Sequence, residues 1–299
     1  MRFQLSTDQV DFRHALDDLL SGTDTVSAAR AWTEGEHGPG RALWKRIADL
    51  GVSGLIVPED DGGLGGSPVD LVVAHEALGH HLVVGPWIET AAYLACVPAH
   101  RARAAGGAML TVAAPYALDA DVAELVAGTT GERLESVDAT RRLFRVADAP
   151  PPDEDAFDMA ALACAAQLLG AAERVLADTV SYVRQREQFG RAIGSFQAVK
   201  HRLADVRIGL DFARPLVYGA ALSVSAGSAG GSRDVSAAKA FAADAAWRAA
   251  RAGLQLHGAL GYTRELDLGL WLLRIRALTR AWGTPAFHRG RVLASLVAA

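Results

Sequence analysis

The chain has 299 residues, of which 51% are hydrophobic, so it can bury a large core as one big domain or two ordinary ones. Its 30 basic and 34 acidic residues leave a formal net charge of -4, too weak to attract nucleic acid or anionic lipid by charge alone. Residues 1–9 contain no apolar targeting segment, and no later stretch reaches about 18 uninterrupted apolar residues. We therefore expect a soluble cytoplasmic protein that neither binds nucleic acid nor crosses a membrane.

Helical patterning dominates the first 95 residues. A helix is predicted to begin after Ser6, because Ser6 and Gln9 have the spacing of a capping box and apolar side chains follow at helical intervals. Further helices are predicted over about 41–50, 68–79 and 86–95. Pro58 and the glycines of 62–66 preclude a continuous helix between the first two of these and predict a loop there.

A short β region and a long helical region follow. Apolar runs predict strands over about 108–112, 122–126, 134–137 and 143–146. Helices are predicted over about 156–185, 201–225 and 235–256, with a flexible Gly/Ser turn over 227–232 and a last helical stretch from 266 onward. We therefore expect a mainly α chain with an N-terminal helical domain (1–104), a much reduced central β region (105–152) and a C-terminal helical bundle (153–299).

Spacing argues against several common kinds of site. The adjacent His80 and His81 and the acidic run 59–61 lack the spacing of metal ligands. The glycines of 62–66 do not spell the dinucleotide-binding pattern and do not lie in a βαβ unit. Cys96 and Cys164 lie in alanine-rich helical surroundings and are interpreted as small core residues. We expect no metal site, no disulfide and no Rossmann nucleotide site.

Two polar, glycine-broken junctions interrupt the apolar C-terminal half. The first runs from Arg184 to Gln197, and the second runs from Gln255 to Glu265. They resemble flavin-binding elements of the acyl-CoA dehydrogenase family, in which such junctions hold the pyrophosphate and adenosine of FAD across a subunit interface. The segments 43–51, 57–65 and 76–79 resemble the family's N-terminal domain, and 138–143 resembles the end of its middle domain, all in family order.

The resemblance implies a fold and a set of ligands. The family has an N-terminal helical domain, a central β-domain and a C-terminal four-helix bundle that pairs in dimers or tetramers. The implied cofactor is FAD, the implied substrate is an acyl-CoA thioester, and the implied electron acceptor is an electron-transferring flavoprotein. Carried over position by position, the FAD-binding residues are Arg186, Gln188, Phe189, Phe196, Gln197, Gln255, Gly258 and Thr284.

The family's catalytic glutamate is missing at both of its known positions. In the family a carboxylate removes the α-proton of the thioester while the β-hydrogen leaves as hydride to the flavin. That glutamate usually precedes a Gly-Thr pair, but here Trp282 precedes Gly283-Thr284. The alternative position, on the first helix of the bundle, holds Ala160, and Ala161 beside it replaces an arginine that often lies near the thioester. No catalytic residue is therefore assigned.

The middle region departs from the family too, because it is short and lacks the segment that binds the flavin ring. The first hypothesis is a non-catalytic subunit that completes the FAD site of a full-length acyl-CoA dehydrogenase partner, as in heteromeric enzymes of actinobacterial steroid side-chain degradation. The second is a self-sufficient homomeric enzyme with a relocated base, for which Glu89 and Glu265 are candidates, or with non-redox thioester chemistry. The third is a cofactor-free interaction protein.

Each junction residue also has a structural interpretation. Arg186 can cap a helix or join an ion pair, and Gly258 can simply break a helix. His257 is interpreted as a hydrogen-bonded structural histidine rather than a general base. Glu265 is interpreted more readily as half of an ion pair at the junction than as a base.

Overall fold

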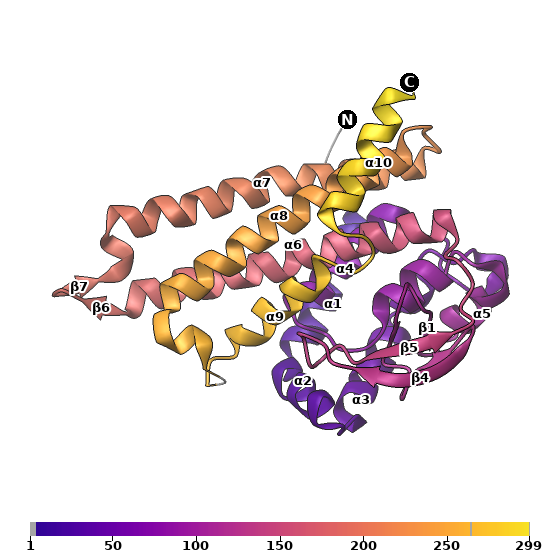
Figure 1. The fold of residues 1–299 in the computed structure, drawn as a ribbon, viewed down its shortest axis with the longest axis horizontal. Coiled ribbons are helices and arrows are strands. Elements are labelled where there is room, and N and C mark those ends of the chain that lie inside the picture. Colours follow the sequence, from indigo (N-terminus) through magenta and orange to yellow (C-terminus); the bar gives the residue numbers. More distant parts are fainter. Residues whose placement is uncertain (1–3, 264, 299) are drawn as a thin grey trace.

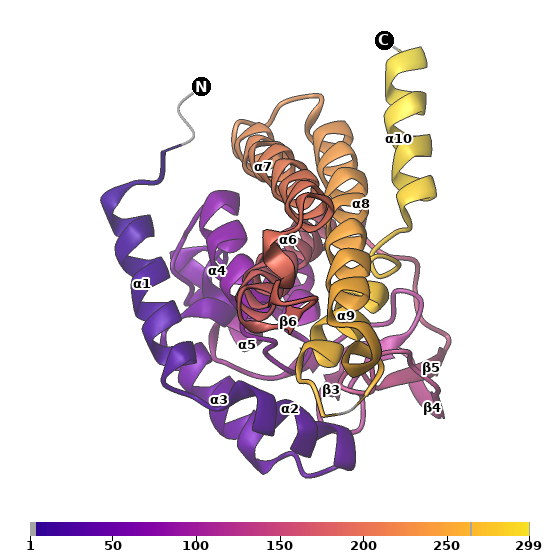
Figure 2. The same cartoon turned by 90° about the vertical axis from the view of Figure 1, so that its left-hand side faces the viewer.

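Helices form most of the molecule, which a computed structural model describes over residues 4–263 and 265–298. Three long helices, α6 (Glu154–Gln185), α7 (Gln197–Ser225) and α8 (Gly231–His257), run alongside one another, and α9 (Leu268–Leu278) and α10 (Pro285–Val297) complete the C-terminal half (Figure 1). The N-terminal helices and a small β region lie together against this bundle (Figure 2). The mainly α organisation predicted from the sequence is confirmed.

The N-terminal helices are α1 (Thr7–Ser21), α2 (Thr25–Glu34), α3 (Gly38–Asp49) and α4 (Pro68–His80). The predicted capping box is present, because the Ser6 hydroxyl accepts from the Gln9 amide at 3.2 Å and the Gln9 side chain accepts from the Ser6 amide at 3.0 Å. The predicted loop around Pro58 holds only short 3-10 turns, Val52–Gly54 and Glu59–Asp61. The helix predicted over 86–95 is a π-helix, η3 (Ile88–Leu94), followed by the 3-10 turn Pro98–His100 and α5 (Arg101–Ala105).

The central region contains short strands. β1 (Leu110–Thr111) pairs in parallel with β3 (Glu124–Leu125), while β2 (Ala117–Leu118), β5 (Leu143–Ala147) and β4 (Thr129–Leu134) form an antiparallel sheet in that order. The predicted strand over 134–137 is wrong, because Leu134 already pairs with Leu143 and residues 135–142 form the connection between the two strands. The exposed β4 carries no apolar run that sequence reasoning could detect.

Helices α4 and α6 cross at two glycines. A Cβ on Gly170 would lie 1.9 Å from the carbonyl oxygen of Glu76, and a Cβ on Gly79 would lie 2.2 Å from the carbonyl oxygen of Gln167. This close approach lets the N-terminal helices share one apolar core with α6, α7, α8 and α9. The crossing therefore joins the two halves of the chain.

Helix α6 lies at the centre of that core. By length and composition alone it could cross a membrane, but 89% of its apolar 18-residue window is buried inside the fold, so it is packed as a core helix. Cys164 is buried in α6 and is not in a disulfide, which agrees with its interpretation as a core residue. Cys96 is also free and is partly buried.

The last helical stretch is interrupted between α9 and α10. Trp282 and Gly283 adopt left-handed φ values of 54° and 94°, which no helix can continue through. Thr284 then caps α10, because its hydroxyl accepts from the Phe287 amide at 3.2 Å. The other predicted bounds shift less: α7 begins at Gln197, before the expected 201, and α8 begins at Gly231, which shortens the expected turn.

Candidate functional site

The first junction is a β-hairpin rather than a plain helix break. After α6, β6 (Glu187–Gln188) pairs with β7 (Arg191–Ala192), and the 3-10 turn Ile193–Ser195 leads into α7. The turn residues Phe189 and Gly190 have left-handed φ values of 54° and 77°, as a tight two-residue hairpin turn requires. The hairpin projects from one end of the bundle (Figure 1).

Side chains of the hairpin and of Phe196, the residue before α7, form an aromatic and cationic group. Phe189 is 91% exposed, and its ring centroid lies 6.3 Å from that of Phe196 in an edge-to-face arrangement. The guanidinium of Arg191 lies 4.1 Å from the centroid of the Phe196 ring. The sequence analysis did not assign Arg191 to the site, although its pairing with Gln188 across a Phe-Gly turn places it there.

Arg186 joins α6 to the hairpin. Its backbone amide donates to the carbonyl oxygen of Tyr182 at 2.9 Å, and its carbonyl oxygen accepts from the Ile193 amide at 2.8 Å. Its side chain is exposed and makes no hydrogen bond or ion pair with another described residue. Helix capping therefore accounts for the backbone of Arg186 but not for its guanidinium. Gln188 and Gln197 are exposed beside it.

The second junction lies next to the first. Helix α8 ends at His257, and Gly258 follows with a φ of 60°. The buried His257 ring stacks 4.2 Å from the ring of Tyr182 and bonds through Nδ1 to the carbonyl oxygen one turn earlier at 2.8 Å, as predicted for a structural histidine. Because Tyr182 lies one helical turn before Arg186, this stack brings the exposed Gln255 and Gly258 beside the hairpin.

Thr284 lies elsewhere. It is exposed at the start of α10, whereas the hairpin lies at the far end of the bundle (Figure 1). The chain therefore gathers seven of the eight residues assigned to FAD at one end and leaves Thr284 apart from them. The seven are Arg186, Gln188, Phe189, Phe196, Gln197, Gln255 and Gly258.

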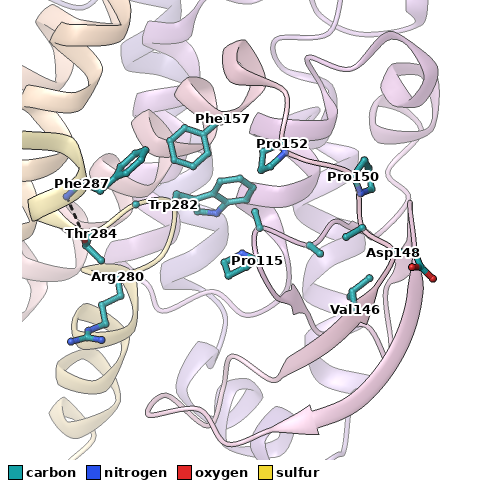
Figure 3. A pocket seen from close by; sticks show the side chains of 14 residues that line it. Pro115, Val146, Asp148, Pro150, Pro152, Phe157, Arg280, Trp282, Thr284 and Phe287 are labelled. Carbon is teal, nitrogen blue, oxygen red and sulfur yellow. Dashed lines mark hydrogen bonds between the residues drawn. The ribbon is translucent and has the colours of Figure 1, made fainter. Parts of the chain in front are cut away.

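Thr284 lines a cleft between the α9–α10 loop and the central region, which we name the Trp282 cleft (Figure 3). The cleft has two hollows of about 690 Å³ each. Their shared lining residues are Ala114, Pro115, Arg280, Trp282 and Thr284. The first hollow adds mainly apolar rings, those of Pro150, Pro152, Phe157 and Phe287. The second hollow adds charged side chains, those of Glu89, Glu135, Arg141 and Arg276.

The two family positions for the catalytic base hold apolar side chains. Trp282 is 3% exposed, and its ring centroid lies 5.3 Å from that of Tyr93 in a stacked arrangement and 5.9 Å from that of Phe157. Ala160 and Ala161 are fully buried in α6. Neither Trp282 nor Ala160 can accept a proton from a thioester, and Ala161 supplies no charge at the position that often carries an arginine.

Glu89 is the candidate base that lies at the cleft. It is 4% exposed, its Oε1 lies 3.9 Å from Arg141, and its buried Oε2 accepts no hydrogen bond of ordinary geometry from a described residue. Burial raises the pKa of Glu89, while the positive charge of Arg141 and the neighbouring Trp282 indole oppose that rise. Glu265 is exposed, does not line the cleft and forms no ion pair with another described residue. Its neighbour Arg264 lies outside the described residues, so the ion pair expected at the junction stays a prediction.

Buried polar contacts fix the loop that carries Trp282. The fully buried Lys239 of α8 donates to the carbonyl oxygen of Leu278 at 3.0 Å and lies 3.5 Å from that of Gly283. Burial lowers the pKa of Lys239. No group of three or more His, Cys, Asp or Glu side chains that could hold a metal ion occurs within residues 4–263 and 265–298.

Comparison with known proteins gives matches at both ends of the chain. A family model described as the acyl-CoA dehydrogenase N-terminal domain matches residues 6–101, and one described as the C-terminal domain matches 153–297. The acyl-CoA dehydrogenase IpdE2 of Mycobacterium tuberculosis is 33% identical over 91% of this chain and 92% of its own length. The IpdE2 protein of Mycolicibacterium smegmatis is 32% identical over 94% and 96%.

Solved structures share the fold. The ChsE4-ChsE5 complex from Mycobacterium tuberculosis contains a chain that matches with a TM-score of 0.85 and 23% identity over all of both chains. The Tcur3481-Tcur3483 steroid ACAD matches with a TM-score of 0.86 and 22% identity over 98% of this chain and 99% of that one. With both domain families matched and relatives aligned almost end to end across the short middle region, this chain belongs to the acyl-CoA dehydrogenase family.

Proposed function

We propose that this chain is the non-catalytic subunit of a heteromeric, FAD-dependent acyl-CoA dehydrogenase and completes the FAD site of a full-length partner. When bound, FAD would accept the hydride that leaves the β-carbon of an acyl-CoA thioester. An electron-transferring flavoprotein would then accept the electrons. We also propose that the acyl group is bulky and steroid-like, because one structural neighbour is named as a steroid ACAD. The proposed location is the cytoplasm.

The distribution of the assigned residues carries this proposal. Seven of them gather at one exposed end of the bundle, and Thr284 lies at the other side of the chain. Phe189 is exposed at the hairpin tip, and the Arg186 side chain has no partner among the described residues, which suits contacts with a ring and with a phosphate group. The hairpin therefore fits one part of FAD, and a second chain is needed to enclose the rest.

The family positions of the base support the non-catalytic role. Trp282 fills one of them with a buried indole, and Ala160 leaves the other without a polar group. A full-length partner would supply the missing carboxylate. Two structural neighbours are named as pairs of different chains, which favours an assembly of this kind.

The test is the visible absorbance of bound oxidised flavin. The chain is purified alone and after co-expression with a full-length family member encoded beside it. We expect colour only in the complex, and loss of that colour in Arg186→Ala. Arg184→Ala is the matched control, because Arg184 is also exposed but lies within α6, before the hairpin, and is not among the residues assigned to FAD. A chain that is yellow by itself contradicts the shared site.

One observation favours a second candidate function, a self-sufficient enzyme. Glu89 is buried at the Trp282 cleft, its Oε2 accepts no hydrogen bond of ordinary geometry from a described residue, and burial raises its pKa, as is common for a general base. Its ion pair with Arg141 gives the same residue a structural role. Turnover of acyl-CoA by the isolated chain, lost in Glu89→Gln, would select this second function over the first.

A further inference from the structure

A buried lysine and a buried cysteine meet beneath the loop between α9 and α10. Lys239 of α8 and Cys164 of α6 are both 0% exposed, and their side chains are hydrogen-bonded to each other. Both also reach the carbonyl oxygen of Leu278, which lies 3.0 Å from the amine and 3.4 Å from the thiol sulfur. Neither side chain is among the residues assigned to FAD, so completion of an FAD site does not explain their contact.

Lys239 has no carboxylate partner among the described residues, although a fully buried ammonium group usually has one. Burial lowers the pKa of the Lys239 amine and raises the pKa of the Cys164 thiol, so it favours the uncharged form of both. Transfer of the thiol proton to the amine leaves the net charge of the pair unchanged and therefore costs less than ionising one group alone. The pair thus gives access to a thiolate, the nucleophilic form of cysteine.

A small oxidant has a short path to the sulfur. Cys164 Sγ lies 3.7 Å from the carbonyl oxygen of Ala281, and Ala281 lines the second hollow of the Trp282 cleft. One residue of the loop therefore separates the thiol from an open hollow. Hydrogen peroxide is uncharged and close to water in size, so it crosses such a layer more readily than a charged oxidant does.

We propose that hydrogen peroxide joins Cys164 to Lys239 through a reversible covalent bond between Sγ and Nζ. The thiolate attacks one oxygen of the peroxide, so that the S–O bond forms and the O–O bond breaks, and the leaving hydroxide takes the proton held by the amine and becomes water. The neutral amine then attacks the sulfur of this sulfenic acid. The S–N bond forms, the S–O bond breaks, and the hydroxyl leaves with an amine proton as a second water.

The electrons of this reaction balance, because the thiol and the amine together lose two electrons and one peroxide gains them. The reverse reaction needs a reductant. Two molecules of a thiol supply two electrons and two protons, which restore the cysteine and the amine as the two thiols join in a disulfide. The link is therefore an oxidation state of the chain rather than permanent damage.

The bond changes what holds the loop. In the reduced chain Lys239 donates to the Leu278 carbonyl oxygen and lies 3.5 Å from that of Gly283. In the linked chain the nitrogen keeps a single N–H and is tied to α6, so the lysine loses donors to the loop. The loop is therefore held in the reduced chain and loosened in the oxidised one. The pair acts as a redox switch for the segment that carries Trp282.

The test is peptide mapping by mass spectrometry of the whole chain after exhaustive treatment with hydrogen peroxide. We expect one crosslinked species that joins the Cys164 and Lys239 peptides, with their summed mass less two hydrogen atoms, and that a thiol reductant removes. The chain contains its own controls, because Cys96 is a second free thiol and Lys45 and Lys200 are the other lysines. None of these three residues should appear in a crosslink.

Hydrogen–deuterium exchange measures the effect on the loop. Exchange of the backbone amides of residues 279–284 should become about tenfold faster in the linked chain, because roughly one hydrogen bond is lost. Cys164→Ala keeps Lys239 and its contacts with the loop, so its exchange should match that of the reduced native chain and should not respond to peroxide. Lys239→Met should give no crosslink and should show the faster exchange without peroxide.

Four results would overturn the proposal: no crosslink in the native chain, a crosslink to another lysine, a crosslink that retains an oxygen atom, or exchange of the loop that the crosslink leaves unchanged. The shared FAD site is tested separately. Cys164→Ala in complex with a full-length partner should keep the flavin absorbance, and Arg186→Ala should still form the crosslink. The two proposals therefore fail independently.

Discussion

Arg274 of α9 donates to Asp138 of the central region across 2.6 Å, and the two side chains are only 3% and 2% exposed. The same guanidinium donates to the Thr140 hydroxyl at 2.7 Å and to the Val83 carbonyl oxygen at 3.0 Å. The 138–143 segment, singled out for its family resemblance, thus has a physical role. It anchors α9, and with it the loop that carries Trp282, to the rest of the fold.

Removing one partner of this pair should be strongly destabilising. Arg274→Met leaves the Asp138 carboxylate buried without its countercharge, and we expect the free energy of unfolding to fall by about 3–5 kcal/mol. Urea denaturation of the isolated chain measures the loss. Arg145→Met is the control, because Arg145 pairs with Glu132 at 3.1 Å on the exposed face and should cost about 1 kcal/mol or less. Equal losses in the two variants would rule out the anchoring role.

The α4–α6 crossing should not tolerate a single methyl group. In Gly170→Ala the new Cβ would meet the Glu76 carbonyl oxygen at 1.9 Å, so the helices must separate, at a cost of about 1–3 kcal/mol or more. Gly290→Ala is the matched control, because Gly290 lies in α10 and a Cβ added there would meet no atom within 4 Å. That change should be neutral or stabilising by up to about 1 kcal/mol, since alanine favours helices. Thermal unfolding of both variants distinguishes the two effects.

Buried His75 should make the chain less stable in mild acid. Burial lowers its pKa from 6.5 to about 3, so between these values the unfolded chain binds a proton that the folded chain does not. The contribution of neutral His75 to the free energy of unfolding is fully present above pH 6.5. Below pH 6.5 this contribution falls by at most about 1.4 kcal/mol per pH unit, which amounts to a loss of about 2 kcal/mol at pH 5. His288, whose pKa burial lowers to about 4, acts in the same direction.

The check is the free energy of unfolding at pH 7, 6 and 5. His75→Gln should flatten this dependence, and adding His288→Gln should flatten it further. The absolute stability of each variant does not enter the comparison, because the slope is the quantity measured. A slope unchanged by both substitutions would mean that other groups control the acid response. Glu89 opposes this trend, because burial raises its folded-state pKa above 4.5 and the folded chain therefore binds an extra proton between that raised pKa and 4.5.

The sequence predicts the helices well, because their apolar faces recur at a helical period and their caps are local. The capping box at Ser6 is one such case, and the loop at Pro58 is another. Prediction fails where the cause is not local. Strand β4 has exposed side chains and exists through its pairing with β5, and the break at Trp282 depends on a left-handed backbone that a tryptophan does not signal.

The candidate site, like the fold, could be predicted only in part from the sequence. The motif around Arg186 identifies residues that the structure does gather, but only the folded chain shows that they lie on a hairpin and that Arg191 stacks on Phe196. The distance of Thr284 from that hairpin follows from the course of α9 and the loop after it, which lead the chain away from the hairpin end of the bundle and which no spacing in the sequence reveals. The burial of Glu89 beside Arg141 likewise depends on packing between segments far apart in the chain.

The hairpin tip should matter for the cofactor and not for folding. Phe189 is 91% exposed, so Phe189→Ala removes almost no buried surface and should change the free energy of unfolding of the isolated chain by less than about 0.5 kcal/mol. In the complex with a full-length partner the same variant should lose flavin absorbance, because the ring that we propose contacts the cofactor is gone. Phe144→Ala is the opposite control: Phe144 is 7% exposed in β5, and its loss should cost about 3–5 kcal/mol. If Phe189→Ala instead destabilises the isolated chain while the complex keeps its colour, the hairpin is a structural element and the shared FAD site must lie elsewhere.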